Sequence, residues 1–198
     1  MKVATLTLPL KNNYGGIIQA FALQNAIENL GYETKLINMS STACRPTHKA
    51  LFSIIKKNVI RFISSAVFWN KKEKESDVFD VFIESEIKLT KRVNYKFQLK
   101  NKEIQDFDTY IVGSDQVWRN DYALDMGIYF FDFVTRTKIL ASYAASFGKE
   151  SWSYSADETS SSTKLVKCFS HVSVRENSAI KLCNDKLDVI AESHLDPT

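Results

Sequence analysis

A carboxylate and an arginine, Asp115 and Arg175, each follow an apolar segment of the chain and could together serve a group-transfer reaction. Asp115 belongs to Gly113–Trp118 (GSDQVW), and Arg175 belongs to Ser173–Glu176 (SVRE). A carboxylate can accept a proton from a hydroxyl group. The guanidinium group of an arginine offers a planar, permanently charged fork for a phosphate or a carboxylate. The pair therefore indicates chemistry between a hydroxyl group and an anionic substrate.

Each of these residues also has a simpler interpretation. Trp118 could form an apolar wall for a sugar ring, but Asp115 could equally be a helix N-cap with Trp118 in the core. Arg175 could pair with Glu176 or with Asp115 instead of binding a substrate. The residues alone leave both alternatives open.

A third candidate segment, Asn12–Gly16 (NNYGG), lies between an apolar stretch and an amphipathic one. Its two glycines allow a sharp turn and a close approach of the backbone to a ligand. A helix beginning there would present free amides and a partial positive charge to a phosphate or carboxylate. A plain tight turn is the alternative. Tyr143–Gly148 (YAASFG) could line the same cleft or be an ordinary strand end.

These motifs require elements that bring them to one place. Apolar segments predict six strands, at Val3–Leu8, Glu33–Asn38, Tyr110–Val112, Lys138–Ala144, Val172–Val174 and Asp188–Ile190. Helices are predicted between them, at Gly16–Leu30 with Gly31 as a left-handed C-cap, from Ser155 with a Ser155/Glu158 capping box to Phe169, and at Glu176–Cys183. This alternation predicts an α/β fold, a single Rossmann-like domain with a parallel sheet and helices on both faces.

In such a sheet the strands end at one edge, where open α/β folds bind ligands. We therefore expect Asp115 and Arg175 to face a common cleft with Tyr14–Gly16.

Residues 42–105 are predicted to form a basic helical insertion in this domain. Between Cys44 and Gln105 there are 14 Lys/Arg against 7 Asp/Glu. A helix at Lys49–Trp69 has a wide apolar face flanked by basic residues, so we expect it to dock on an anionic membrane surface. Packing of that face on the sheet or on a further domain is the alternative. A second helix is predicted at Ser76–Ile87. No nucleic-acid partner is expected, because no interleaved aromatic and basic pattern and no zinc-finger spacing occur.

The composition is that of an ordinary globular protein of 198 residues, with 44% hydrophobic residues. Its three cysteines are widely spaced and form no CxxC pair, which favours idle thiols in a reducing compartment. His171 and His194 are expected to be structural or exposed, and no metal site is predicted. With no signal-peptide pattern and no apolar stretch of membrane-spanning length, we expect a cytoplasmic protein, in peripheral contact with the inner membrane face if the basic helix docks there.

The motifs together resemble those of the polysaccharide pyruvyl transferase family. The resemblance rests on the NYGG turn followed by Gln19–Gln24 (QAFALQ) and, in the same order, on Gly113–Trp118, Tyr143–Gly148 and Ser173–Glu176. It covers nearly the whole chain. It implies transfer of an enolpyruvyl unit from phosphoenolpyruvate to two hydroxyls of one sugar, giving a cyclic ketal and phosphate, without a cofactor. The implied acceptor is a sugar or lipid-linked oligosaccharide of a capsular polysaccharide or exopolysaccharide.

The resemblance also implies roles for individual residues. Asp115 and Arg175 are the expected catalytic residues. The expected substrate-binding residues are Asn13, Tyr14, Gly15, Gly16, Gly113, Ser114, Gln116, Trp118, Ser146 and Glu176.

Members of the family have a second half, reached through a Leu-Asp-Pro-Thr string that matches Leu195–Thr198, and the two halves form a glycosyltransferase-B-like architecture. We therefore expect the chain to be the N-terminal half of such a protein, inactive without a C-terminal domain or a partner chain. Two alternatives remain: a non-catalytic module that binds a saccharide or a partner, and half of a glycosyltransferase-B-type enzyme that uses a nucleotide sugar.

Overall fold

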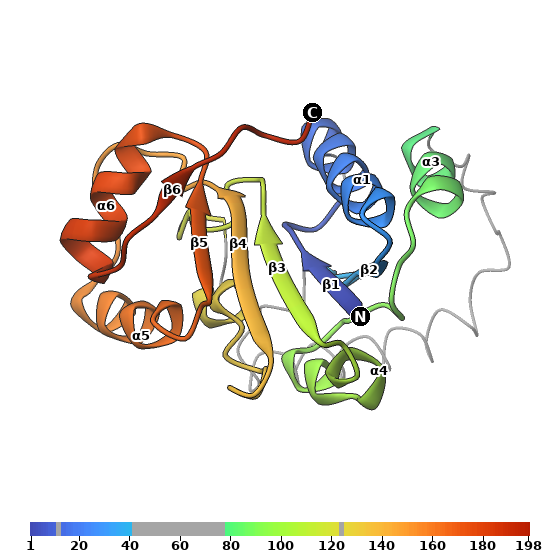
Figure 1. Ribbon diagram of the computed structural model, residues 1–198, viewed down its shortest axis with the longest axis horizontal. Coiled ribbons are helices and arrows are strands. Elements are labelled where there is room, and N and C mark those ends of the chain that lie inside the picture. Colours follow the sequence, from blue (N-terminus) through green and yellow to red (C-terminus); the bar gives the residue numbers. More distant parts are fainter. Residues whose placement is uncertain (11–12, 41–77, 123–124) are drawn as a thin grey trace, which may run out of the picture.

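The computed structural model describes residues 1–10, 13–40, 78–122 and 125–198, and in these residues six strands form one parallel sheet (Figure 1). The strands are β1 (Lys2–Leu6), β2 (Glu33–Leu36), β3 (Thr109–Gly113), β4 (Ile139–Ala145), β5 (His171–Val174) and β6 (Glu192–Ser193). All neighbouring pairs are parallel, in the order β2-β1-β3-β4-β5-β6. The predicted α/β, Rossmann-like class is confirmed.

The strand order reverses at β1. The chain passes from β1 to β2 on one side and later returns to place β3 on the other side of β1. The segments that follow β1 and β3 therefore separate in opposite directions and leave a crevice between them, the switch point at which such sheets bind ligands. This topology decides where the candidate site must lie.

The sixth strand is the one that the sequence analysis misplaced. Asp188–Ile190 is not a strand, because Asp188 adopts a left-handed conformation (φ 53°) that ends the preceding helix. The strand forms two residues farther along, at Glu192–Ser193.

The helices lie on both faces of the sheet, as predicted (Figure 1). They are α1 (Tyr14–Asn29), α3 (Val78–Glu86), α4 (Lys102–Gln105), α5 (Ala156–Val166) and α6 (Asn177–Leu187), with 3-10 helices η1 (Lys96–Lys100) and η2 (Met126–Phe130). Two local predictions are confirmed. Gly31 follows α1 with a φ of 85°, and Ser155 and Glu158 form the capping box of α5.

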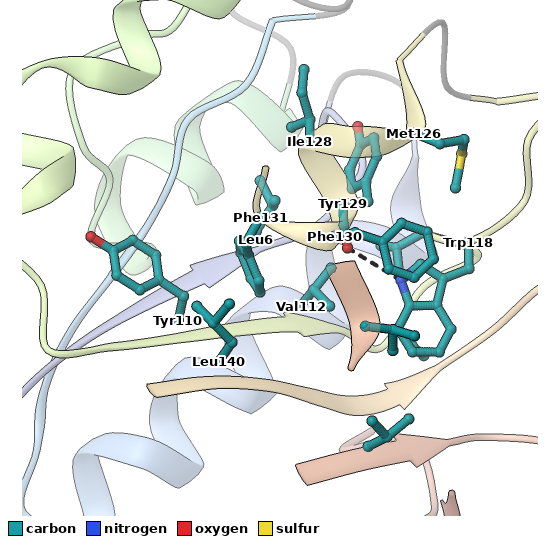
Figure 2. Close-up of a cluster of buried hydrophobic side chains, with 14 of the residues drawn as sticks. Leu6, Tyr110, Val112, Trp118, Met126, Ile128, Tyr129, Phe130, Phe131 and Leu140 are labelled. Carbon is teal, nitrogen blue, oxygen red and sulfur yellow. Dashed lines mark hydrogen bonds between the residues drawn. The ribbon is translucent and has the colours of Figure 1, made fainter. Parts of the chain in front are cut away.

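Alternating side chains of the strands divide the core between the two faces. Leu6, Tyr110 and Val112 belong to the large cluster under η2, α5 and α6 (Figure 2), whereas Val3 and Ile111 pack with residues of α1. The large cluster is rich in aromatic rings, including Trp118 and the run Tyr129–Phe131 of the η2 turn.

The predicted insertion is described only in part. The expected basic helix, Lys49–Trp69, lies outside the described residues. The predicted helix that follows it is confirmed over its described part as α3. The next residues are not helical, because Leu89 and Val93 form parallel bridges with Leu36 and Met39 beside β2. None of the helices that the structure describes combines the length and hydropathy needed to cross a membrane.

Candidate functional site

A pocket of about 340 Å³ lies at the carboxyl edge of the sheet, at the switch point beside β1. It is lined by Asn13, Tyr14, Gly15, Gly16, Ile18, Gln19, Asp115, Gln116, Arg175, Asp196 and Thr198. In Figure 1 the C-terminal segment runs from β6 across the top of the sheet to the first turn of α1. The prediction that Asp115, Arg175 and Tyr14–Gly16 face one cleft is therefore confirmed.

Asn13 joins the first turn of α1 to Asp115. Its Oδ1 accepts a hydrogen bond from the Gly16 amide at 3.0 Å, which makes it the N-cap of the helix. Its Nδ2 donates to Asp115 Oδ2 at 2.8 Å, and the amide of Gln116 donates to the other carboxylate oxygen at 2.7 Å. The carboxylate is thereby oriented at the positive end of α1, where negative charge is favoured. The alternative role of Asp115 as a helix N-cap is wrong, because no helix follows it.

The two glycines of the NYGG turn have different environments. A Cβ on Gly16 would collide with the side chain of Asn13 and lie 3.1 Å from Asp115 Oδ2. Gly16 is therefore required by the close packing of this corner. Gly15 is exposed and has no atom within 4 Å of a Cβ, so it leaves open space at the mouth of the pocket.

The side chain of Gln19 connects α1 to the segment after β3 through hydrogen bonds. Its side chain is 4% exposed, and its Nε2 donates to Thr7 Oγ1 at 2.8 Å and to the Gly16 carbonyl at 2.9 Å. Its Oε1 accepts from the amide of Ser114 at 2.8 Å and from the Ser114 hydroxyl at 3.0 Å. The sequence analysis gave Gln19 no role. The available signal was a polar residue among the apolar positions of the helix.

Arg175 lies on the other side of the pocket and already has acidic partners. Its Nη1 is 3.2 Å from Asp196 Oδ2 and donates to the carbonyl of Ser114 at 3.4 Å. Its Nε is 3.7 Å from Glu176 Oε2. The alternative pairing with Glu176 is thus confirmed. The closer partner is Asp196, which the sequence analysis had named only as part of the Leu195–Thr198 string.

Trp118 does not line the pocket, and its predicted role as a wall for a sugar ring is wrong. The side chain is fully buried, stacks on Phe130 with ring centroids 5.1 Å apart, and donates from Nε1 to the carbonyl of Tyr129 at 3.2 Å (Figure 2). The chain turns after Asp115, so the end of the motif points into the core. The alternative that Trp118 is a core residue is the correct one.

Three other predicted substrate-binding residues are also buried away from the pocket. None of Gly113, Ser114 and Ser146 lines the pocket, although the Ser114 hydroxyl lies 3.4 Å from Oδ2 of Asp196, which does. Ser146 is fully buried and donates to Glu176 Oε1 at 2.6 Å. Glu176 is half-buried and does not line the pocket either. Burial corrects the expected role of Gly113, Ser114 and Ser146 from contact with substrate to positioning of the residues that line the site, and contact of Glu176 with substrate stays a prediction.

The described cysteines do not contribute a nucleophile. Cys183 is fully buried, and burial raises the pKa of its thiol to about 12, which keeps it protonated and unreactive. Cys168 is half-buried and donates to the carbonyl of Lys164. Cys44 lies outside the described residues.

Comparison with known proteins gives one match. The family model of polysaccharide pyruvyl transferase matches residues 13–198. No curated protein and no solved structure matches the chain significantly. The matched range begins at Asn13, the N-cap of α1, and includes every residue described above as lining the pocket.

Proposed function

Because this chain belongs to the polysaccharide pyruvyl transferase family, we propose that it transfers a pyruvyl unit from phosphoenolpyruvate to one sugar of a capsular polysaccharide or exopolysaccharide. The observation that supports this proposal best is the pocket itself. A carboxylate held at a helix N-terminus, Asp115, lines the same cleft as an arginine, Arg175.

The proposed reaction adds two sugar hydroxyls to C2 of the enolpyruvyl unit. Two C2–O bonds to the sugar form, and the bond between C2 and the phosphate oxygen breaks. One hydroxyl proton goes to the vinyl CH₂, which becomes the methyl group of the ketal, and the other leaves with the phosphate. The reaction therefore needs a base near the hydroxyls, a proton donor near the vinyl carbon and cationic groups for the anionic donor.

We assign the base to Asp115, whose carboxylate is oriented by Asn13 and by the amide of Gln116. We assign the anion contact to Arg175, with the first turn of α1 as a second positive region in the same cleft. Tyr14, which is 65% exposed, and Gly15 at the mouth of the pocket are proposed to contact the sugar.

Phosphoenolpyruvate must compete with Asp196 for the guanidinium group. Among the described residues that line the pocket, Arg175 is the one cation, and its closest acidic partner is Asp196 at 3.2 Å. Among the described residues that line the pocket there is no histidine or lysine to protonate the vinyl carbon. We therefore expect residues 1–198 alone to give no measurable transfer, since residues that act as a unit lose nearly all activity when one is missing.

Binding of the donor is the first test. Isothermal titration with phosphoenolpyruvate should detect binding that Arg175→Gln weakens about 10- to 100-fold, the range expected for loss of a charged hydrogen-bond partner. Arg136→Gln is the matched control, because it removes the same charge from an exposed position outside the pocket. Equal binding by the two variants would contradict the assignment of Arg175.

Turnover is the second test. Phosphate release that depends on both phosphoenolpyruvate and a sugar acceptor should be measured with residues 1–198 and with any sequence that the reading frame adds after Thr198. Where release is detected, Asp115→Asn should lower it about 10²- to 10⁴-fold while donor binding persists. Robust release by residues 1–198 alone would refute the expectation of an incomplete site.

The pairing of Arg175 with acidic residues favours a second candidate, a module that binds a saccharide without turnover. Titration with acidic and neutral oligosaccharides separates the two candidates. Saccharide binding without phosphoenolpyruvate binding would support the module. Binding of a nucleotide sugar instead would support a glycosyltransferase half.

A further inference from the structure

A second cluster of chemically versatile side chains lies where β5 and β6 pair at one edge of the sheet. His171 begins β5, Glu192 begins β6, and His194 directly follows β6. The backbone holds them in place, because Glu192 is in register with Ser173 and the amide of His194 donates to the carbonyl of Val174 at 2.9 Å. The parallel pairing therefore brings His171 close to Glu192 and His194, although α6 lies between them in the sequence.

Both imidazoles direct Nε2 at the same carboxylate oxygen. Glu192 Oε2 is 3.6 Å from His171 Nε2 and 3.5 Å from His194 Nε2. These distances are too long for hydrogen bonds. They are close to the separation of two ligands on one tetrahedral zinc ion, about 3.3–3.5 Å for metal–ligand bonds of about 2.0–2.2 Å. The three ligand atoms all lie within 4.8 Å of one another, so small rotations of exposed side chains bring them to one ion.

The donor set selects a class of metal. Two imidazole nitrogens with one carboxylate oxygen suit Zn²⁺ and similar borderline cations, whereas Mg²⁺ and Ca²⁺ prefer sites made of oxygen atoms. The side chains of His171, Glu192 and His194 are 49%, 63% and 38% exposed, so an ion can reach them from solvent. Three protein ligands leave a fourth position for water.

We propose that His171, Glu192 and His194 form a binding site for a borderline divalent cation such as Zn²⁺. The ion would stabilise the pairing of β6, which is only two residues long, with β5. His194 lies two residues before Asp196, which contacts Arg175 and the hydroxyl of Ser114 in the pocket. The metal would therefore also hold the C-terminal segment over the pocket. This inference does not depend on the function proposed above.

The test is titration of metal-free protein with ZnCl₂ in neutral buffer, because histidine ligands must be neutral to bind. We expect saturable binding of one ion per chain and a rise in the unfolding temperature. MgCl₂ should give neither effect. His171→Gln and His194→Gln should each weaken Zn²⁺ binding at least about 10- to 100-fold, the loss that even changes in supporting residues cause at metal sites.

Two control variants remove other side chains that could bind Zn²⁺. His48→Gln removes the remaining histidine of the sequence, and Cys168→Ser removes the half-buried thiol. Both should bind Zn²⁺ like the original chain. Without metal, His171→Gln and His194→Gln should unfold near the original temperature, because their imidazole side chains are 49% and 38% exposed. Should one histidine variant fail to fold, Glu192→Gln provides the same test from the third ligand.

Three results would overturn the proposal. They are absence of saturable Zn²⁺ binding, unchanged binding in both His171→Gln and His194→Gln, and loss of binding in one of the two control variants instead.

Discussion

The two sides of the pocket are built in different ways. On one side, Gln19 and Ser114 are buried, and each described polar group of the Gln19 side chain has a partner at 3.0 Å or less. On the other side, Arg175 lies 3.2–3.7 Å from Asp196 and Glu176, and the three side chains are 24–36% exposed. We call these the amide side and the arginine side.

This difference implies that the amide side is rigid and that the arginine side can change its contacts. Buried, fully paired amides are costly to disturb, so the amide side holds Asp115 in one position. Part-exposed ion pairs contribute little to stability and exchange partners at low cost. The arginine side can therefore change partners when an anion enters, while the amide side keeps its geometry. Three substitutions test this comparison.

The largest effect is expected at Gly113, which ends β3 on the amide side. Its φ of 137° is strained for other residues, and a Cβ would collide with the carbonyl oxygen of Tyr143. Gly113→Ala should lower the free energy of unfolding by about 3 kcal/mol or more, measured by urea denaturation. Gly15→Ala is the matched control, because no atom lies within 4 Å of its Cβ. It should leave stability unchanged or raise it by about 0.5–1 kcal/mol. Similar losses in both variants would contradict this account.

A smaller loss is expected for Gln19→Leu. The change leaves the buried Ser114 amide and Thr7 hydroxyl without their partner, so the free energy of unfolding should fall by about 2–3 kcal/mol. Gln116→Leu is the comparison, because Gln116 is half-exposed and its side-chain oxygen accepts one bond, from Arg119. It should cost less than about 1 kcal/mol. If Gln19→Leu proves as mild as Gln116→Leu, the amide side is not the rigid one.

The smallest change in stability is expected on the arginine side. Asp196→Asn keeps the shape of the side chain and removes its charge, so stability should change by less than about 1 kcal/mol. Inorganic phosphate and phosphoenolpyruvate should bind about 2- to 5-fold more tightly, because Arg175 loses its closest competing carboxylate. Titration calorimetry measures the binding of the two anions, and urea denaturation measures the stability. Weaker anion binding in this variant would mean that Asp196 positions Arg175 instead of competing for it.

Hydrophobic periodicity and the positions of glycines were sufficient to predict most of the fold. The first five strands, the C-cap at Gly31 and the capping box at Ser155 depend on local pattern, and local pattern is visible in a sequence. Asp188 shows the limit, since a left-handed non-glycine residue that displaces a strand has no clear local signal.

The site was predictable only where the direction of the strands decides on which edge of the sheet a residue lies. Asp115 and Arg175 follow strands of one sheet, so their convergence could be inferred before any coordinates. Trp118 could not be assigned in that way, because a turn of the chain decides whether a ring faces a sugar or the core. Asp196 and the His171–Glu192–His194 cluster depend on where β6 pairs, and that pairing is a tertiary event.

The two edges of the sheet bear on how the protein behaves at high concentration. Unpaired strand edges recruit strands of other molecules and promote aggregation. At the β2 edge, Leu36 and Met39 form bridges with Leu89 and Val93, and the side chain of Gln24 pairs with both the amide and the carbonyl of Lys88. At the opposite edge β6 offers only two residues as a template. Across the residues that the structure describes, edge-to-edge association is therefore disfavoured, because bridging residues cover the β2 edge and β6 is only two residues long.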